Sequence, residues 1–307
     1  MPKIPRRGSI RIPPLMTQDS VTSDIMSNMV VIAGLGHRIA FFVPPTSDKT
    51  PSLFSCPVPW TEAVQHQGQS LGWKPQRFCL EDWTETDDIG FALSSRRTHP
   101  MGTAYSADSA YPPPDPTTGA PRNPGGRTGV PGRGYLPYWG PNPALILVAT
   151  RLVSTTKTPR PQLVFAMFSH HIGEQLPWCL VKHSLRCSGM DCTKNLVDML
   201  INTRVTECTR TDPENRLEYE KMRTCYQRCK FSKNFHGFIN DMINTDNAWI
   251  EPTVAHLHFD MEIPDPSILL RLLVPEDVSL AWTSIDEVRA LRESHKKICR
   301  DISRNLT

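Results

Sequence analysis

Two segments rich in glycine, asparagine and aromatic residues constrain this chain of 307 residues more than any other feature. The first, residues 122–142, reads RNPGGRTGVPGRGYLPYWGPN, and the second, residues 244–251, reads NTDNAWIE. Glycine and asparagine permit the positive φ angles of tight turns, and we expect Trp139 and Trp249 to anchor these turns in a core. The two segments therefore predict shaped turns beside a packed core.

The hydrophobic pattern between and after these segments is regular. Short runs rich in β-branched and aromatic residues predict strands at 146–149, 163–168, 178–181, 253–260 and 279–282. Helices are expected at 191–203, at the charged stretch 209–230, and at 286–302, where Ser284 and Glu287 form a capping box. Strands on both sides of a central helix, followed by a C-terminal helix, predict an α+β sandwich with a mixed sheet.

Composition divides the chain into three parts. Residues 1–50 form a basic leader, in which the apolar run 30–43 predicts a hairpin of two strands. Residues 51–125 contain several tryptophans but no long periodic helix, which predicts a small, irregular N-terminal cap subdomain. Residues 126–307 carry the regular pattern and form the predicted core.

Charge and hydropathy exclude two classes of partner. The net charge is +3, and no basic stripe interleaved with aromatic residues is present, so we expect no nucleic-acid binding. The apolar run 30–43 is too short to span a bilayer, so we expect no membrane insertion. Residues 1–18 have the charge of a mitochondrial transit peptide, but their prolines prevent an amphipathic helix, which favours a cytoplasmic location.

The cysteines point to a reducing compartment. Nine cysteines, an odd number, occur without a secretory leader, which predicts free thiols. A zinc site built from Cys187, Cys192, Cys225 and Cys229 is disfavoured because neither pair has the tight two-residue spacing of common zinc ligands.

The motif residues carry a family resemblance. The stretches Gly126-Arg127-Thr128-Gly129, Gly132-Arg133-Gly134 and Trp139-Gly140-Pro141-Asn142 resemble the entry segment of the ADP-ribose pyrophosphatase branch of the Nudix superfamily. The second segment, NTDNAWIE, resembles another signature of that branch. The branch also includes a cytoplasmic domain of melastatin-type cation channels. The resemblance covers residues 120–300 and implies a Nudix-type α/β/α sandwich. It further implies that the domain binds ADP-ribose or a related nucleotide diphosphate, and that other domains of a larger channel are its partners.

The family's chemistry requires a helix with several glutamates, which hold divalent cations that bridge a pyrophosphate. By the resemblance, this glutamate run falls near residues 197–203, which read VDMLINT, and residues 176–204 contain no glutamate. Between Trp178 and Thr206 the only carboxylates are Asp191 and Asp198. They lie about two helical turns apart, roughly 10 Å along the axis, which is too far to close on one metal. We therefore expect no catalytic residue and no metal site.

Three functions remain open on this pattern. The leading one is a catalytically degenerate domain that senses a nucleotide or assists assembly. In the second, Glu207, or Glu214 with Glu218, folds back to hold Mg²⁺, and the chain is an active ADP-ribose diphosphatase that releases AMP and ribose 5-phosphate. The third is a purely structural interaction domain. No cofactor is expected, except Mg²⁺ in the enzymatic case.

The resemblance also assigns ligand-binding positions. Lys182, Ser184 and Arg186 fall where the family holds its cation, so a metal-free pyrophosphate could bind there through charge-assisted hydrogen bonds. A solvated basic surface is the alternative. Asp241 matches an acid that contacts the distal ribose in the family. The nearby family arginine is replaced by Ile243, which removes a specific contact.

Six signature residues are expected to act as scaffold rather than as ligand contacts: Arg127, Arg133, Asn142, Asp246, Asn247 and Trp249. In this interpretation, Arg127 and Arg133 attach the glycine-rich segment to the core through carboxylates such as Asp246.

Overall fold

The computed structural model describes residues 29–34, 37–42, 111–153 except 135, 162–170, 173–181, 190–260 except 242, 279–287, 291 and 293–306. Most of the predicted leader and cap therefore lies outside the described residues. The predicted boundaries at 50 and 125 accordingly remain predictions.

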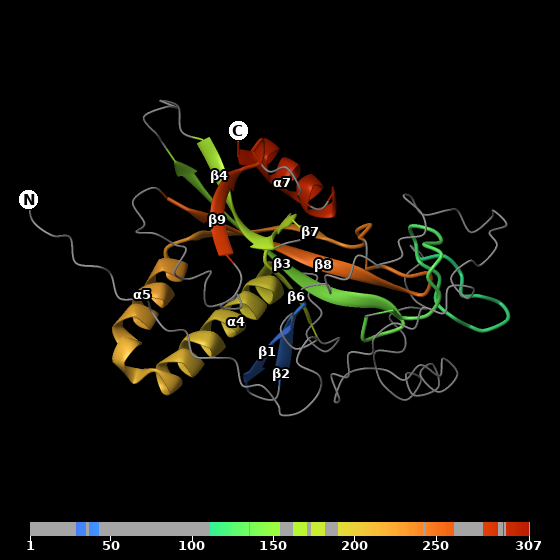
Figure 1. Cartoon of the computed structure of the whole chain (residues 1–307), viewed down its shortest axis with the longest axis horizontal. Coiled ribbons are helices and arrows are strands. Elements are labelled where there is room, and N and C mark those ends of the chain that lie inside the picture. Colours follow the sequence, from blue (N-terminus) through green and yellow to red (C-terminus); the bar gives the residue numbers. More distant parts are fainter. Residues whose placement is uncertain are drawn as a thin grey trace, which may run out of the picture.

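A mixed sheet forms the centre of the molecule (Figure 1). Its strands among the described residues are β1 (Met29–Gly34), β2 (His37–Phe42), β3 (Gly140–Val153), β4 (Gln162–His170), β5 (Gly173–Gln175), β6 (Trp178–Leu180), β7 (Lys230–His236), β8 (Ala248–Phe259) and β9 (Ser279–Ser284). Strand β3 is central: it runs parallel to β8 on one side and antiparallel to β6 and β4 on the other. Strand β7 pairs with β8, and β4 also pairs with β5 and β9.

The apolar run 30–43 forms the predicted hairpin, β1 with β2. Strand β2 pairs with β6 at Ala40 and Leu180, so the hairpin extends the core sheet. The part of the chain that we assigned to a leader thus contributes strands to the central layer.

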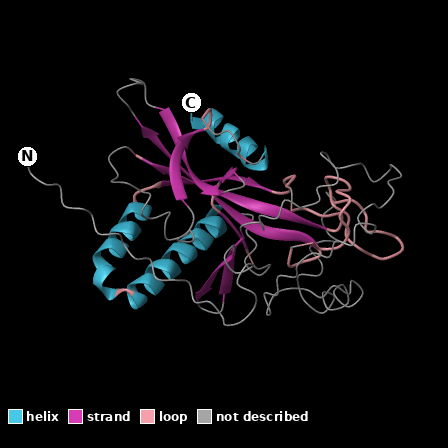
Figure 2. Ribbon diagram, in the orientation of Figure 1, coloured by secondary structure: helices cyan, strands magenta, loops and turns pink. Residues whose placement is uncertain are grey.

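Helices cover both faces of the sheet (Figures 1 and 2). Helix α4 (Met190–Thr211), the short 3₁₀ helix η2 (Pro213–Asn215) and helix α5 (Arg216–Gln227) lie on one face, and α7 (Glu293–Leu306) lies on the other. This arrangement confirms the predicted α+β fold with a mixed sheet. Within the described part of the chain, no helix combines the length and the apolar character needed to cross a membrane.

The core consists of two apolar layers, one on each side of the sheet. Leu145, Leu147 and Ala149 of β3 face α4 and α5, whereas Ile146 and Val148 face α7. Successive side chains of a strand alternate between faces. Because both faces are covered, β3 is buried continuously through its first eleven residues, as expected for a central strand of a covered sheet.

Two helix boundaries differ from the prediction. The first helix continues to Thr211, eight residues beyond the predicted end at 203. The C-terminal helix begins at Glu293, because Ser284 pairs with Val164 in the sheet and Ile285–Glu287 form a turn. The predicted capping box at Ser284 and Glu287 was therefore wrong: these residues close a strand instead of opening a helix.

Candidate functional site

The two signature segments meet where β3 and β8 begin side by side. The parallel register pairs Gly140 with Ala248 and Asn142 with Ile250. The Gly140 amide donates to the carbonyl oxygen of Asn247 at 2.7 Å, and the Asp246 amide donates to that of Val130 at 2.8 Å. We call this junction of residues 121–142 with residues 244–251 the signature clasp.

Asp246 holds the first turn of the clasp. It is 2% exposed, and its Oδ1 accepts hydrogen bonds from the Thr128 amide at 2.6 Å, the Thr128 hydroxyl at 3.0 Å and the Gly129 amide at 3.0 Å. Gly129 has a φ of 82°, a left-handed conformation that glycine adopts without strain. The carboxylate therefore fixes a turn that requires this glycine.

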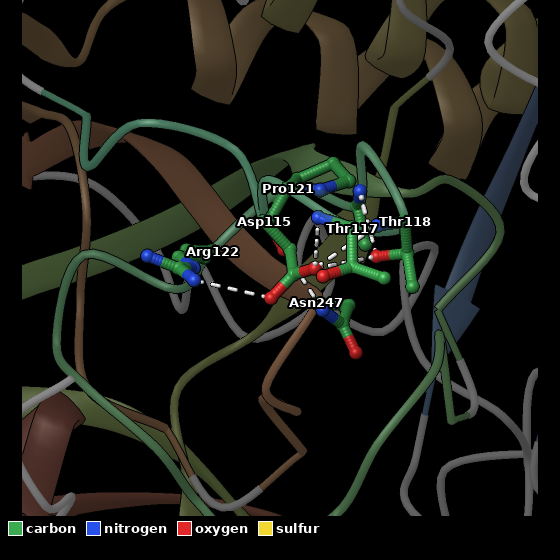
Figure 3. Close-up of polar contacts among 7 residues, drawn as sticks. Asp115, Thr117, Thr118, Pro121, Arg122 and Asn247 are labelled. Carbon is green, nitrogen blue, oxygen red and sulfur yellow. Dashed lines mark hydrogen bonds and ion pairs between the residues drawn. The ribbon is translucent and has the colours of Figure 1, made fainter.

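Asn247 holds the second turn. Its side-chain oxygen accepts from the Gly132 amide at 2.9 Å, and its Nδ2 donates to the carbonyl oxygen of Pro121 at 2.9 Å (Figure 3). A nearby turn is held by Asp115, whose Oδ1 accepts from the Thr118 amide and whose Oδ2 pairs with Arg122. These two contacts lower the pKa of Asp115 to about 2, and the hydrogen bond from the Thr118 amide contributes more than the ion pair with Arg122.

Asn142 and Arg133 stabilise the loop that enters β3. Asn142 is fully buried, and its amide group exchanges hydrogen bonds with the Tyr138 backbone in both directions. Arg133, also buried, donates through Nη1 to the carbonyl oxygens of Leu136 and Pro137, at 2.9 and 3.0 Å. Arg127 is half-buried at the Asp246 turn. Arg133 thus stabilises this loop through backbone carbonyl oxygens. Contacts of Arg127 and Arg133 with carboxylates remain a prediction.

Trp249 connects the clasp to the core. It is completely buried, and its Nε1 donates to Glu251 at 3.1 Å. The Tyr111 hydroxyl donates to the same carboxylate, and the Tyr111 ring centroid lies 5.5 Å from that of Trp249. Residues 111–142 are therefore attached to β8 at both ends, through Tyr111 and through the pairing of Gly140 with Ala248.

The ligand-binding positions are only partly described. Lys182, Ser184 and Arg186 lie outside the described residues. Asp241 is 7% exposed; its Oδ1 accepts from the Ile243 amide at 3.2 Å, and its Oδ2 accepts from the Ser294 hydroxyl of α7 at 3.0 Å. Asp241 consequently lies on the α7 side of the sheet.

By the resemblance, the family's glutamate run falls on helix α4, at residues 197–203. Val197, Leu200 and Ile201 of the aligned run are completely buried in the core. Asp198 accepts from Lys194 Nζ at 2.8 Å and from the Tyr226 hydroxyl of α5 at 2.6 Å. Burial, followed by Asp198, raises the pKa of Tyr226, so the phenol stays protonated and donates. The carboxylate in the run therefore connects α4 to α5.

The cysteines correct one expectation. Cys192 is disulfide-bonded, so the prediction of a free thiol was wrong for this residue. The nine cysteines require only that at least one thiol lacks a partner within the chain. Burial raises the pKa of the free thiol of Cys229 to about 12, far from the thiolate form that binds metals or attacks substrates. Among the described residues, no three His, Cys, Asp or Glu side chains gather into a potential metal site.

A cavity of about 280 Å³ lies beside Asp198, between α4, α5 and the start of β7. Its lining residues are Lys194, Asp198, Asn202, Arg223, Tyr226, Gln227, Cys229 and Phe231. We call it the α4–α5 pocket. Lys194, Asp198 and Asn202 recur every four residues, so they share one face of α4. The sequence drew attention to Asp198 but not to the pocket, because nothing in the local pattern indicates that α5 packs against this face.

The pocket is equipped for binding rather than for nucleophilic chemistry. Tyr226 and Cys229 are its candidate nucleophiles, and burial raises the pKa of both groups. An activated nucleophile requires a lowered pKa or an adjacent base. Asp198, the carboxylate beside them, is already bound by Lys194 and Tyr226.

Comparison with known proteins agrees with this fold. Residues 82–140 match the NUDT9-like, N-terminal domain. The chain is 30% identical over 185 residues to a Caenorhabditis elegans protein that carries the name nudix hydrolase 6, and 28% identical over 193 residues to the mitochondrial ADP-ribose pyrophosphatase of Rattus norvegicus. It is also 28% identical over 201 residues to the rat transient receptor potential cation channel subfamily M member 2.

These matches cover 59–60% of this chain. They cover 62% and 53% of the two hydrolase relatives, in the order given, and 12% of the channel. The chain therefore spans little more than half the length of the hydrolase relatives.

The mixed sheet, with α4 and α5 on one face and α7 on the other, defines an α+β protein with a Nudix-type fold. The comparisons support a resemblance of this chain to the ADP-ribose pyrophosphatase branch of the Nudix superfamily. It is thus an ADP-ribose pyrophosphatase-like module with the fold of a hydrolase.

Proposed function

We propose that this chain is a catalytically degenerate domain that binds ADP-ribose, or a related nucleotide diphosphate, without hydrolysing it. The observation that carries the proposal is the state of Asp198. It is the one carboxylate in residues 197–203, and both of its oxygens accept from Lys194 at 2.8 and 3.1 Å. An ammonium group at this distance repels the divalent cation that the family's reaction needs.

Loss of the metal removes most of the catalytic power. In the family's reaction the divalent cation neutralises the charge that develops on the pyrophosphate, and it activates the attacking water. Such electrostatic stabilisation is usually the largest single contribution to the rate. The buried residues Val197, Leu200 and Ile201 offer nothing in its place, because they pack against the sheet.

The proposed binding residues are Lys182, Ser184 and Arg186 for the pyrophosphate and Asp241 for the distal ribose. Asp241 is included because, by the resemblance, it matches the acid that contacts the distal ribose in the family, and the Ile243 amide and the Ser294 hydroxyl hold its carboxylate in place. The two basic residues replace the family's cation. Binding is therefore independent of metal and sensitive to salt, since exposed charges are screened within about 8 Å at physiological ionic strength.

Calorimetry with ADP-ribose tests this proposal. The parent protein is titrated at low and high salt, with and without Mg²⁺, together with a Lys182→Ala/Arg186→Ala double variant. Lys297→Ala, which removes an exposed charge on α7, is the control. We expect binding at low salt that the double variant loses and the control keeps. Binding that requires Mg²⁺, or that ignores the double substitution, contradicts the proposal.

A purely structural role is the second candidate, and the signature clasp favours it. Asp246, Asn247 and Asn142 use their side chains on backbone groups of the same fold. Complete absence of ADP-ribose binding at low salt supports this candidate against the first.

We further propose that the module works at the cytoplasmic face as part of a larger, melastatin-type channel. The similarity to a 12% portion of such a channel supports this context. Sequencing the full-length transcript tests it. Transmembrane segments encoded upstream in the same reading frame support the proposal, and an in-frame stop codon shortly before Met1 contradicts it.

A further inference from the structure

The α4–α5 pocket is separate from the proposed ADP-ribose contact at Asp241. Asp241 accepts from Ser294 of α7, on one face of the sheet. The pocket is lined by α4, α5 and β7, and Tyr226 in its wall belongs to the apolar layer on the opposite face. A ligand held within the pocket is therefore on the opposite side of the sheet from Asp241.

The wall of the pocket contains a buried hydrogen-bond donor that lacks an acceptor among the described residues. Lys194 and Arg223 bring two positive charges to its wall. The Nε of Arg223 is buried and has no hydrogen-bond partner among the residues that the structure describes, although Nη1 reaches Glu220 at 3.2 Å. A buried donor without a partner costs roughly 1–3 kcal/mol. Asp198 also lines the pocket, and its carboxylate accepts from Lys194 and Tyr226.

The remaining walls determine the size and character of the ligand. Tyr226 and Phe231 supply flat apolar surface, and Asn202 and Gln227 supply amide groups. The volume of about 280 Å³ lies at the lower end of ligand pockets, which hold roughly 300–1,000 Å³. A single phosphorylated sugar is of a suitable size, whereas a whole dinucleotide is too large.

We propose that the α4–α5 pocket binds the phosphate monoester of a single sugar, without a metal ion. The phosphate oxygens accept from the guanidinium of Arg223 and from the ammonium of Lys194, which is half-exposed and retains donors beyond those given to Asp198. The sugar lies against Tyr226 and Phe231, with its hydroxyl groups on the two amide side chains.

Calorimetry with three probes tests the ligand chemistry: ribose 5-phosphate, inorganic phosphate and unphosphorylated ribose, all without divalent cations. We expect ribose 5-phosphate to bind at least tenfold more tightly than either of the other two. Equal affinity for inorganic phosphate contradicts the sugar-binding part, and binding of ribose as tight as that of its phosphate contradicts the anion-binding part.

Variants locate the site. Arg223→Gln and Lys194→Gln each lower the affinity for ribose 5-phosphate at least tenfold, and Arg223→Lys lowers it less. Lys221→Gln is the matched control, because Lys221 lies on the same helix and pairs with Glu218 away from the pocket. A thermal melt accompanies each variant, and Arg223→Lys provides the readout if Arg223→Gln unfolds. Unchanged affinity in a folded Arg223 variant overturns the proposal.

This inference and the proposed function fail separately. ADP-ribose binding depends on Lys182 and Arg186, and ribose 5-phosphate binding depends on Arg223. Arg223→Gln is expected to leave ADP-ribose binding unchanged. If ribose 5-phosphate displaces ADP-ribose in a competition titration, the two ligands share one site and the second pocket is disproved.

Discussion

Near the start of β3 and β8, single polar side chains form hydrogen bonds with backbone groups that regular secondary structure would otherwise satisfy. Asp246 and Asn247 satisfy backbone groups of the glycine-rich segment more than 110 residues away in the chain. The sequence predicted their scaffold role, but not their partners. The choice among backbone groups depends on the parallel register of the two strands, which no local pattern encodes.

Replacing Asp246 with alanine tests this role. The change leaves the buried amides of Thr128 and Gly129 without an acceptor, so we expect the free energy of unfolding to fall by roughly 2–4 kcal/mol. Urea unfolding measures it. Asp260→Ala is the control, because its carboxylate is exposed and pairs only at the surface with Lys230; no measurable change is expected there. An Asp246 variant as stable as the parent contradicts the scaffold role.

Trp249 is the largest completely buried side chain among the residues that the structure describes. Trp249→Ala is expected to lower the free energy of unfolding by roughly 3–5 kcal/mol, the usual range for truncating a buried aromatic residue. Trp249→Phe keeps a ring but removes the hydrogen bond to Glu251, so it should cost less. An unchanged melting temperature in the alanine variant is inconsistent with the burial described here.

At the scale of elements, the sequence predicted those whose periodicity is visible and missed the boundaries set by tertiary contacts. Strand β8 begins at Ala248, five residues before the predicted start at 253, because Trp249 and Glu251 are both buried there and leave no alternation to detect. Helix α7 begins at Glu293, after its predicted start at 286, because Ser284 pairs with Val164 of β4 in the sheet. The packing of α5 on α4, which forms the pocket, has no local signal.

A buried histidine on β8 makes the stability of the sheet dependent on pH. His256 is 4% exposed, its Nε2 lies 2.7 Å from the Thr150 hydroxyl, and Nδ1 lies 3.3 Å from that of Ser232. Burial first, and then the charge of His258, lower the pKa of His256 to about 4 from an ordinary value of 6.5. The unfolded chain therefore binds the proton first as the pH falls.

We expect the free energy of unfolding to fall between pH 6.5 and pH 4, with His256 contributing up to about 3 kcal/mol of that loss. Urea unfolding across this window measures it, and His256→Gln should reduce the slope. The comparison isolates His256 from His258, Asp260 and other groups that titrate nearby. Identical slopes in the two proteins are the contrary result.

At the scale of the whole molecule, a Nudix-type fold is combined with a helix, α4, that we propose no longer binds metal. The residues of α4 on which, by the resemblance, the glutamate run falls pack into the core or connect to α5 through Asp198. The sheet and both layers of helices remain intact. The fold class and the missing glutamates were both accessible from the sequence. The use of Asp198 was not, because it depends on Tyr226, 28 residues further along the chain.

An assay of ADP-ribose hydrolysis is the most direct test of the proposal that catalysis has been lost. The protein is incubated with ADP-ribose and either Mg²⁺ or Mn²⁺, with the rat mitochondrial ADP-ribose pyrophosphatase as the positive control, and released AMP is measured. We expect no AMP above the enzyme-free background under either condition. AMP release that EDTA abolishes, and that Asp198→Asn or Glu207→Gln also abolishes, contradicts the account and establishes an active diphosphatase with displaced carboxylates.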